Sequence, residues 1–119
     1  MKPQVFLSPE DVESMDWEPF PGMAGVYERV LAFDEETGSY TRLIRADPGF
    51  ESDEVRSHDF WEESYILEGS FEENGVVYGP GTFVCNQPGF EHGPYRSETG
   101  WLALEICYFP AGMKGNART

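Results

Sequence analysis

The sequence contains few of the residues that most often carry chemistry. Among its 119 residues there are two histidines, two cysteines and eight lysines and arginines, against 22 acidic residues. The formal net charge of −14 argues against binding to nucleic-acid backbones or anionic membrane surfaces, because both require an excess of positive charge. We therefore expect neither nucleic acid nor membrane as a partner.

Long apolar segments are also missing. No run approaches the roughly 20 residues of a membrane-spanning helix, and the stretch from Met1 to Pro9 lacks the apolar core of a signal peptide. We therefore expect a cytoplasmic protein. Cys85 and Cys107 each lie in an apolar run, which favours buried free thiols over metal ligation, because cytosolic thiols stay reduced.

The sequence does contain enough apolar material for one core. Hydrophobic residues make up 39% and aromatic residues 15%, so the chain is not a disordered acidic tail. Its length suits a single domain. We expect an N-terminal arm at residues 1–22, a barrel at residues 23–110 and a flexible C-terminal tail at residues 111–119.

From Gly25 onward the sequence predicts short β-strands and no long helix. Apolar or alternating runs are separated by turn residues about every eight to twelve positions, which is typical of a β-sandwich or small barrel. Asn74-Gly75 is a strong hairpin signal. Near the N-terminus, Ser8 and Pro9 are typical of the start of a short helical turn. The expected strands cover residues 26–33, 39–46, 64–68, 70–73, 76–78, 82–86 and 101–109.

Both histidines lie close to other polar or turn residues. His58 precedes Glu62 by four residues, and His92 ends a Pro-Gly loop that follows another strand. Two imidazoles and a carboxylate are suitable ligands for a first-row metal ion. On one straight strand His58 and Glu62 would lie about 13 Å apart, since each residue adds about 3.3 Å. Residues 59–61 must therefore turn if the two side chains are to share an ion.

Beyond this turn, the alternation of a strand separates two sets of side chains. The expected faces are Glu62, Ser64 and Ile66 on one side and Glu63, Tyr65 and Leu67 on the other.

The spacing of these residues resembles that of a known family. His58-x3-Glu62, followed by Gly69, resembles the second half of the first cupin motif, Gly-x5-His-x-His-x3–4-Glu-x6-Gly. Pro88-Gly-x-x-His92 resembles the second cupin motif. More narrowly, residues 62–83 are similar to the cupin domain of ChrR-type anti-sigma factors, a branch similar to the acetylacetone and dihydroxyacetophenone dioxygenases. The resemblance covers about residues 17–109.

For the fold, the resemblance implies an all-β structure, the cupin-type double-stranded β-helix or jelly-roll barrel. Such a barrel has edge strands that a second copy can cover, so we expect a homodimer.

The resemblance also implies site residues. His58, Glu62 and His92 match metal ligands of the two motifs, and the interval to Gly69 favours Glu62 over Glu63 as the inward acid. These three would hold a divalent metal ion, Fe(II) in the first place and Zn, Mn or Ni as alternatives. Arg56 stands where the motif has its first histidine, and a guanidinium cannot donate a lone pair to a metal.

Two interpretations of Arg56 remain open. In one, the two histidines and the carboxylate form a metal site with open positions, a pattern associated with non-haem Fe(II) and dioxygen. In the other, the metal is lost and Arg56 pairs with Glu62 or holds an anionic ligand.

Three functions follow. The first is a metal-dependent oxidoreductase of the dioxygenase type that cleaves a diketone or aryl ketone, with Arg56 and Glu62 as catalytic residues and Arg56, Phe60 and Tyr95 in contact with the substrate. The second is a metal-free cupin that binds an anionic sugar or organic acid as an isomerase or lyase. The third is a sensor or regulatory cupin without activity.

The remaining conspicuous residues have a structural interpretation. The arginines on the first strands, Arg29, Arg42 and Arg45, are expected to be solvated partners of the acids, with at most one exception. One or two aromatic residues are expected to line a pocket, and the others to fill the core: Phe60, Trp61, Tyr65, Tyr78, Phe83, Phe90 and Tyr95.

Overall fold

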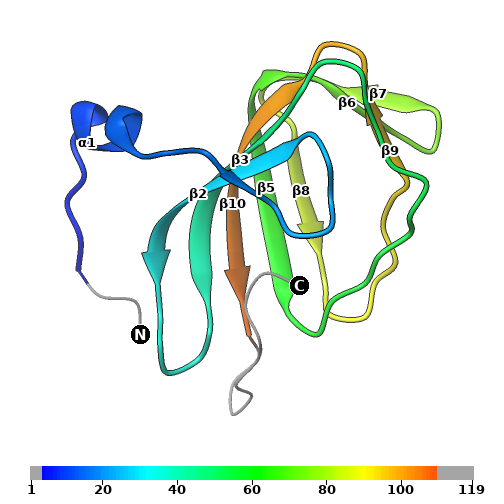
Figure 1. The fold of residues 1–119 in the computed structure, drawn as a ribbon. Coiled ribbons are helices and arrows are strands. Elements are labelled where there is room, and N and C mark those ends of the chain that lie inside the picture. Colours follow the sequence, from blue (N-terminus) through cyan, green and yellow to red (C-terminus); the bar gives the residue numbers. More distant parts are fainter. Residues whose placement is uncertain (1–3, 110–119) are drawn as a thin grey trace.

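The computed structural model describes residues 4–109, and the tail expected at residues 111–119 lies outside this range. Within this range one short helix, α1 (Pro9–Ser14), is followed by strands only (Figure 1). No helix in the described range is long and apolar enough to cross a membrane. The strands are β1 (Glu18–Pro19), β2 (Val26–Phe33), β3 (Tyr40–Ala46), β4 (Phe50–Glu51), β5 (Trp61–Gly69), β6 (Phe71–Glu73), β7 (Val76–Tyr78), β8 (Phe83–Asn86), β9 (Tyr95–Ser97) and β10 (Trp101–Tyr108).

The strands form two antiparallel sheets. The larger has the order β1-β2-β3-β10-β5-β8, and the smaller has the order β4-β9-β6-β7. Strands far apart in the chain are neighbours in both sheets, as in a jelly roll. Figure 1 shows β6, β7 and β9 beside one end of the larger sheet. The prediction of an all-β jelly-roll barrel is confirmed, and the three strands that the sequence did not predict, β1, β4 and β9, are only two or three residues long.

Local sequence signals correspond to the turns and caps of the structure. Asn74 and Gly75 have positive φ angles of 53° and 78° and join β6 to β7, which is the geometry preferred in tight hairpins. Ser8 caps α1: its hydroxyl accepts a hydrogen bond from Asp11 N at 3.1 Å, and the Asp11 carboxylate accepts one from Ser8 N at 3.0 Å. Both predictions are confirmed.

Strand β5 shows how alternation builds the interior. Glu62, Ser64 and Ile66 are buried, whereas Tyr65 and Leu67 are exposed, as predicted. Ile66 thereby joins a cluster between the two sheets that also includes the arm residue Phe20. The buried members of this cluster are Phe20, Val26, Ile44, Ala46, Phe50, Ile66, Phe71 and Ala103.

The same alternation corrects several sequence-based expectations. Tyr65 and Phe83 face each other across β5 and β8 on the outer side, and they are 46% and 58% exposed. Cys85 lies on the same outer side of β8 and is exposed, while Cys107 is buried as predicted. Phe90 lies in the loop after β8 and is also exposed. The expectation that these residues are buried is wrong: for Tyr65, Phe83 and Cys85 strand parity determines the exposed side, and Phe90 lies in a loop.

The arginines on β2 and β3 hold the N-terminal arm. The guanidinium carbons of Arg29 and Arg45 lie 4.2 and 4.8 Å from the centre of the Trp17 ring. Arg29 also donates a hydrogen bond from Nε to the carbonyl of Met15 at 3.0 Å and is buried. The expectation of a solvated Arg29 is therefore wrong.

Gly69, which closes β5, generates a stability prediction. It has a φ of +74°, and a Cβ atom there would lie 2.0 Å from the carbonyl oxygen of Gly100 and 2.9 Å from Cα of Trp101. Because both contacts are backbone, relief requires β5 and β10 to separate locally. We expect Gly69→Ala to lower the free energy of unfolding by about 3 kcal/mol, roughly 1 from left-handed strain and 2 from overpacking.

The matched control is Gly49→Ala, where φ is +83° and no atom lies within 4 Å of the added carbon. It should cost only the strain, about 1 kcal/mol. Urea denaturation followed by tryptophan fluorescence measures both variants. Equal losses in the two would show that the close approach of Gly69 to Gly100 has no energetic weight.

Candidate functional site

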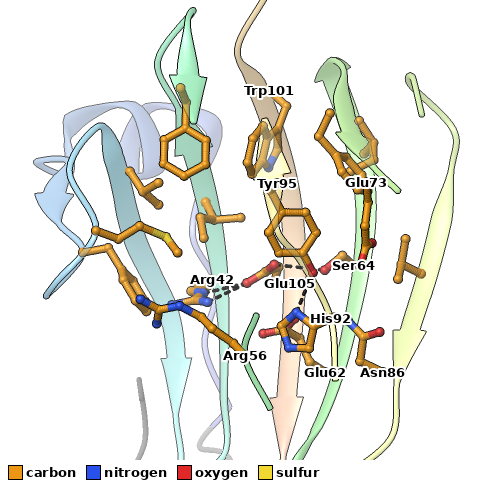
Figure 2. Close-up of a pocket in the computed structure, with 18 of the residues that line it drawn as sticks. Arg42, Arg56, Glu62, Ser64, Glu73, Asn86, His92, Tyr95, Trp101 and Glu105 are labelled. Carbon is orange, nitrogen blue, oxygen red and sulfur yellow. Dashed lines mark hydrogen bonds and ion pairs between the residues drawn. The ribbon is translucent and has the colours of Figure 1, made fainter. Parts of the chain in front are cut away.

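A cavity of about 80 Å³ lies inside the barrel, between the two sheets. One part of its wall is apolar and includes the ring of Trp101, while the other part is polar (Figure 2). Both histidines contribute to the polar part. The polar lining residues are Arg42, Arg56, His58, Glu62, Ser64, Glu73, Asn86, His92, Tyr95 and Glu105.

His58 and Glu62 reach the cavity because the chain bends before β5. The bend lies at residues 59–60, inside the segment that the sequence requires to turn. Nε2 of His58 lies 3.8 Å from Oε2 of Glu62, and both side chains are mostly buried. Glu62, the second residue of β5, is the inward acid, whereas Glu63 is on the opposite face.

His92 arrives from the loop between β8 and β9. The backbone N–H groups of Arg56 and His92 each donate to the other's carbonyl at 2.8 Å, and Gly89 N donates to the His58 carbonyl at 2.8 Å. The rings of His58 and His92 therefore lie 4.9 Å apart, centre to centre. The structure brings together ligand atoms of His58, Glu62 and His92 so that all lie within 4.8 Å of one another.

One nitrogen of the His92 ring forms a hydrogen bond, and the other has no hydrogen-bond partner among the described residues. Its Nδ1 forms a hydrogen bond with the hydroxyl of Tyr95 at 2.5 Å. Its Nε2 is fully buried and has no hydrogen-bond partner within residues 4–109. A buried polar atom without a partner costs free energy that a bound ligand would recover.

Burial controls the protonation of this group. Desolvation, followed by the neighbouring His92, lowers the pKa of His58 to about 4, and burial likewise lowers the pKa of His92. Desolvation, followed by the charge of Glu105, raises the pKa of Glu62 to about 8. At neutral pH both imidazoles therefore have a free lone pair, while Glu62 holds a proton that a nearby cation would displace.

A second polar group lies deeper in the barrel. Arg42 donates from Nε and Nη2 to Oε1 of Glu105 at 2.9 and 2.7 Å, and from Nη1 to Glu28 at 3.1 Å. The hydroxyl of Ser64 donates to the other oxygen of Glu105 at 3.0 Å. Arg42 is 4% exposed, so its assignment as a solvated arginine is wrong. Two-residue periodicity could have found it, because Arg42 shares the buried face of β3 with Tyr40.

Three further residues in the polar lining were not singled out from the sequence. Asn86 lies directly opposite Glu62 in the β5–β8 pairing and is buried. Glu73 accepts a hydrogen bond from Gly93 N at 2.7 Å, next to His92. Ligand atoms of Glu62, Glu105 and Cys107 also lie within 4.8 Å of one another. Two carboxylates therefore stand close together beside the histidines.

The remaining predicted site residues lie as follows. Tyr95 lines the cavity next to His92. Phe60 lies outside the lining and stacks on His58, with ring centres 4.8 Å apart and an interplanar angle of 13°. Arg56 lines the cavity, but its guanidinium pairs with Glu54 at 2.7 Å and not with Glu62, because Glu54 lies two residues away on the same extended segment.

Solved structures share this fold. An RmlC-like cupin from Shewanella frigidimarina is 24% identical in sequence and superposes with a TM-score of 0.70. The match covers 93% of this chain and 96% of that chain. An acetylacetone dioxygenase from Acinetobacter johnsonii is 17% identical, with a TM-score of 0.68 and coverages of 90% and 73%. A chain of the complex between Rhodobacter sphaeroides SigE and the anti-sigma ChrR is 19% identical, with a TM-score of 0.60 and coverages of 80% and 50%. At these identities the likeness shows the fold alone.

Sequence comparison identifies the family. No curated protein matches the chain. The family model described as ChrR Cupin-like domain matches residues 9–106, which extend from α1 into β10 and include His58, Glu62 and His92. With the jelly-roll barrel and the inward-facing residues of both motifs, this match shows that the chain belongs to the cupin superfamily, in the family of ChrR cupin-like domains.

Proposed function

We propose that this chain is a small metal-dependent cupin enzyme that acts on a small organic molecule. The observation that carries the proposal is Nε2 of His92, a buried nitrogen that has no partner among residues 4–109 and belongs to the same cluster as His58 and Glu62. The two imidazoles and the carboxylate are the donor types that suit Fe, Zn, Mn and Ni.

The spacing of the donors supports this assignment. Ligand atoms bound to one ion at about 2.1 Å lie at most about 4.2 Å apart. His58 and Glu62 already meet this limit at 3.8 Å, and all three groups fall within 4.8 Å. Small side-chain rotations are therefore sufficient. A cation here would also stabilise the ionised form of Glu62, which burial and the nearby charge of Glu105 disfavour.

The donor set also supports a reaction class. Arg56 takes the place of one histidine ligand, which leaves two histidines and one carboxylate, the set that non-haem Fe(II) oxygenases use. A bound divalent ion would polarise an oxygen of the substrate. The most specific version of the proposal is dioxygenase-like cleavage of a diketone or aryl ketone, for which the shared fold of an acetylacetone dioxygenase is supporting evidence. The apolar wall would hold the hydrocarbon part of the substrate, and Arg56 would stabilise an enolate.

A non-catalytic regulatory role is the second candidate. It is favoured by the family match, since the ChrR structure that shares this fold is an anti-sigma protein in complex with SigE. In that role the metal site would serve stability or sensing. The Fe(II)-loaded protein would then form a stable complex with another protein and would not consume dioxygen with acetylacetone or an aryl diketone.

Metal binding is the first test. Protein prepared without an affinity tag and treated with a chelator should bind about one equivalent of Fe(II) or Mn(II) in anaerobic calorimetry. Glu62→Gln should weaken binding at least about 100-fold, because it removes a charged ligand from a three-residue set. Glu63→Gln is the matched control, since its side chain is on the opposite face of β5. Absence of stoichiometric binding by wild type, or equal affinity of the two variants, would overturn the proposal.

The raised pKa of Glu62 predicts a pH dependence of metal affinity. Below pH 8 an ion must displace the proton of Glu62, whose pKa is about 8, whereas His58, with a pKa of about 4, is already neutral. The apparent affinity for Mn(II) should therefore rise about tenfold per pH unit between pH 6 and 8 and then level off. Titrations in buffers of different ionisation enthalpy should detect about one proton released per ion at pH 6.5. A constant affinity across this range contradicts the assignment of Glu62.

Tyr95 generates a separate prediction about the orientation of His92. Its hydroxyl holds Nδ1, so Nε2 is directed to the metal position only while that hydrogen bond exists. Tyr95→Phe should lower metal affinity about tenfold without unfolding the protein. Tyr65→Phe, on the exposed outer face, removes the same hydroxyl and should leave the affinity unchanged. Competition with a fluorescent chelator measures both, and an unaltered affinity in Tyr95→Phe would count against this role.

A further inference from the structure

We propose that Arg56 binds a carboxylate of the ligand, and that Glu54 occupies this position while the cavity is empty. The ligand would then be a small organic acid, with its carboxylate on Arg56 and a second oxygen toward His58, Glu62 and His92. This inference rests on the proposed function, a metal site that acts on a small organic molecule, and it names an organic acid as that molecule in place of the diketone or aryl ketone.

The position of Arg56 is fixed by the main chain. Its backbone exchanges two hydrogen bonds of 2.8 Å with His92, so the guanidinium extends from the same rigid connection as a proposed metal ligand. Figure 2 shows Arg56 and His92 at the same end of the cavity, with Trp101 at the other end. Arg56 lines the same cavity as His58, Glu62 and His92, so a ligand in that cavity can contact both its guanidinium and these residues.

Arg56 has hydrogen-bonding capacity that the protein does not use. Its Nη2 donates to Oε2 of Glu54 at 2.7 Å, while its Nε is buried and has no partner within the described residues. Nε and Nη2 form one edge of the planar guanidinium, which is the edge that binds a carboxylate through two parallel hydrogen bonds. Glu54 engages half of that edge. A ligand carboxylate can engage both nitrogens.

The other arginine of the cavity cannot take this role. Arg42 is held by Glu105 through two donors and by Glu28 through a third, all at 3.1 Å or less, and it is 4% exposed. Its charge is already compensated by two buried carboxylates. Arg56 is 23% exposed and has one carboxylate partner, which makes it the cavity cation that an incoming anion can reach.

Glu54 is suited to be displaced. Its side chain is 62% exposed, so it returns to water when it leaves Arg56. Exposed ion pairs contribute little to stability, because water screens the charges and both side chains lose rotamer freedom. The exchange of Glu54 for a better-aligned ligand carboxylate is therefore inexpensive. In a chain with a formal charge of −14, an organic anion also needs such a local cation to remain bound.

The experiment compares dicarboxylates with their monoamides. Malonate, succinate and glutarate, and the monoamide of each, are titrated by calorimetry into Mn(II)-loaded wild type, Arg56→Gln and Glu54→Gln. At the best chain length, wild type should prefer the dicarboxylate by about tenfold, the discrimination expected from charge-assisted hydrogen bonds. Arg56→Gln should reduce the preference to less than about twofold. Glu54→Gln should bind the dicarboxylate about two- to fivefold more tightly, because its internal competitor is gone.

The pair Arg96–Glu51 provides matched controls. These two side chains form an ion pair at 3.2 Å, are 61% and 67% exposed, and do not line the cavity. Arg96→Gln and Glu51→Gln make the same charge changes and should leave both affinities as in wild type. A dicarboxylate preference that is absent in wild type, or that persists in Arg56→Gln, overturns the inference.

Titration of the same samples with Mn(II) distinguishes two negative results. One is that Arg56 does not bind a carboxylate, and the other is that the proposed metal site does not exist. If Mn(II) binds but carboxylates are not preferred, the metal assignment stands and the role of Arg56 is wrong. If Mn(II) does not bind, the proposed function fails. A carboxylate preference that still depends on Arg56 in that metal-free protein would then support the anion site alone.

Discussion

The two backbone hydrogen bonds between Arg56 and His92 are the constraint on which the candidate site depends. They join the segment before β5 to the loop after β8, two parts of the chain that are more than 30 residues apart. Without this link, among the described backbone hydrogen bonds, only the one from Gly89 N to the His58 carbonyl would still hold the loop that carries His92 to the segment that carries His58. Because the bonds use main-chain atoms, the side chain at position 56 can change from histidine to arginine without moving His92. An arginine at this position, where the cupin motif that the sequence resembles has a histidine, is therefore compatible with the observed position of His92.

Inside the barrel, a network of buried charges lies beside the candidate site. Arg42 compensates Glu105 and Glu28 in a network that also includes Ser64, and it lies on the wall of the cavity that contains Glu62. A buried ion pair of this kind contributes little net stability over an apolar core, but removal of one partner is costly. The network therefore fixes the number and the position of negative charges near the histidines.

The sequence predicted the elements with strong local signals and missed those that depend on the partner strand. The Asn74-Gly75 hairpin, the Ser8 cap and the alternation of β5 were predictable because each is determined by neighbours in the chain. Spacing alone did not require His58, Glu62 and His92 to meet, and the resemblance to the cupin motifs is what predicted that these three residues face one cavity. The Arg42–Glu105 pair was not predicted because the two residues are 63 positions apart, and because a charged side chain is expected to be exposed to solvent. The contact of Arg56 with Glu54 depends on the path of an irregular segment, which no periodicity describes.

The N-terminal arm contacts the outer surface of the barrel and also forms part of the wall of the cavity. Trp17 is held on the outer face by Arg29 and Arg45, while Phe20, three residues further on, lines the cavity and lies over the guanidinium of Arg42 at 4.7 Å. A displacement of the arm cannot leave the cavity unchanged, because so short a connection transmits movement of one ring to the other. The shape of the cavity at Phe20 consequently depends on the contacts that hold the Trp17 indole on the outer surface.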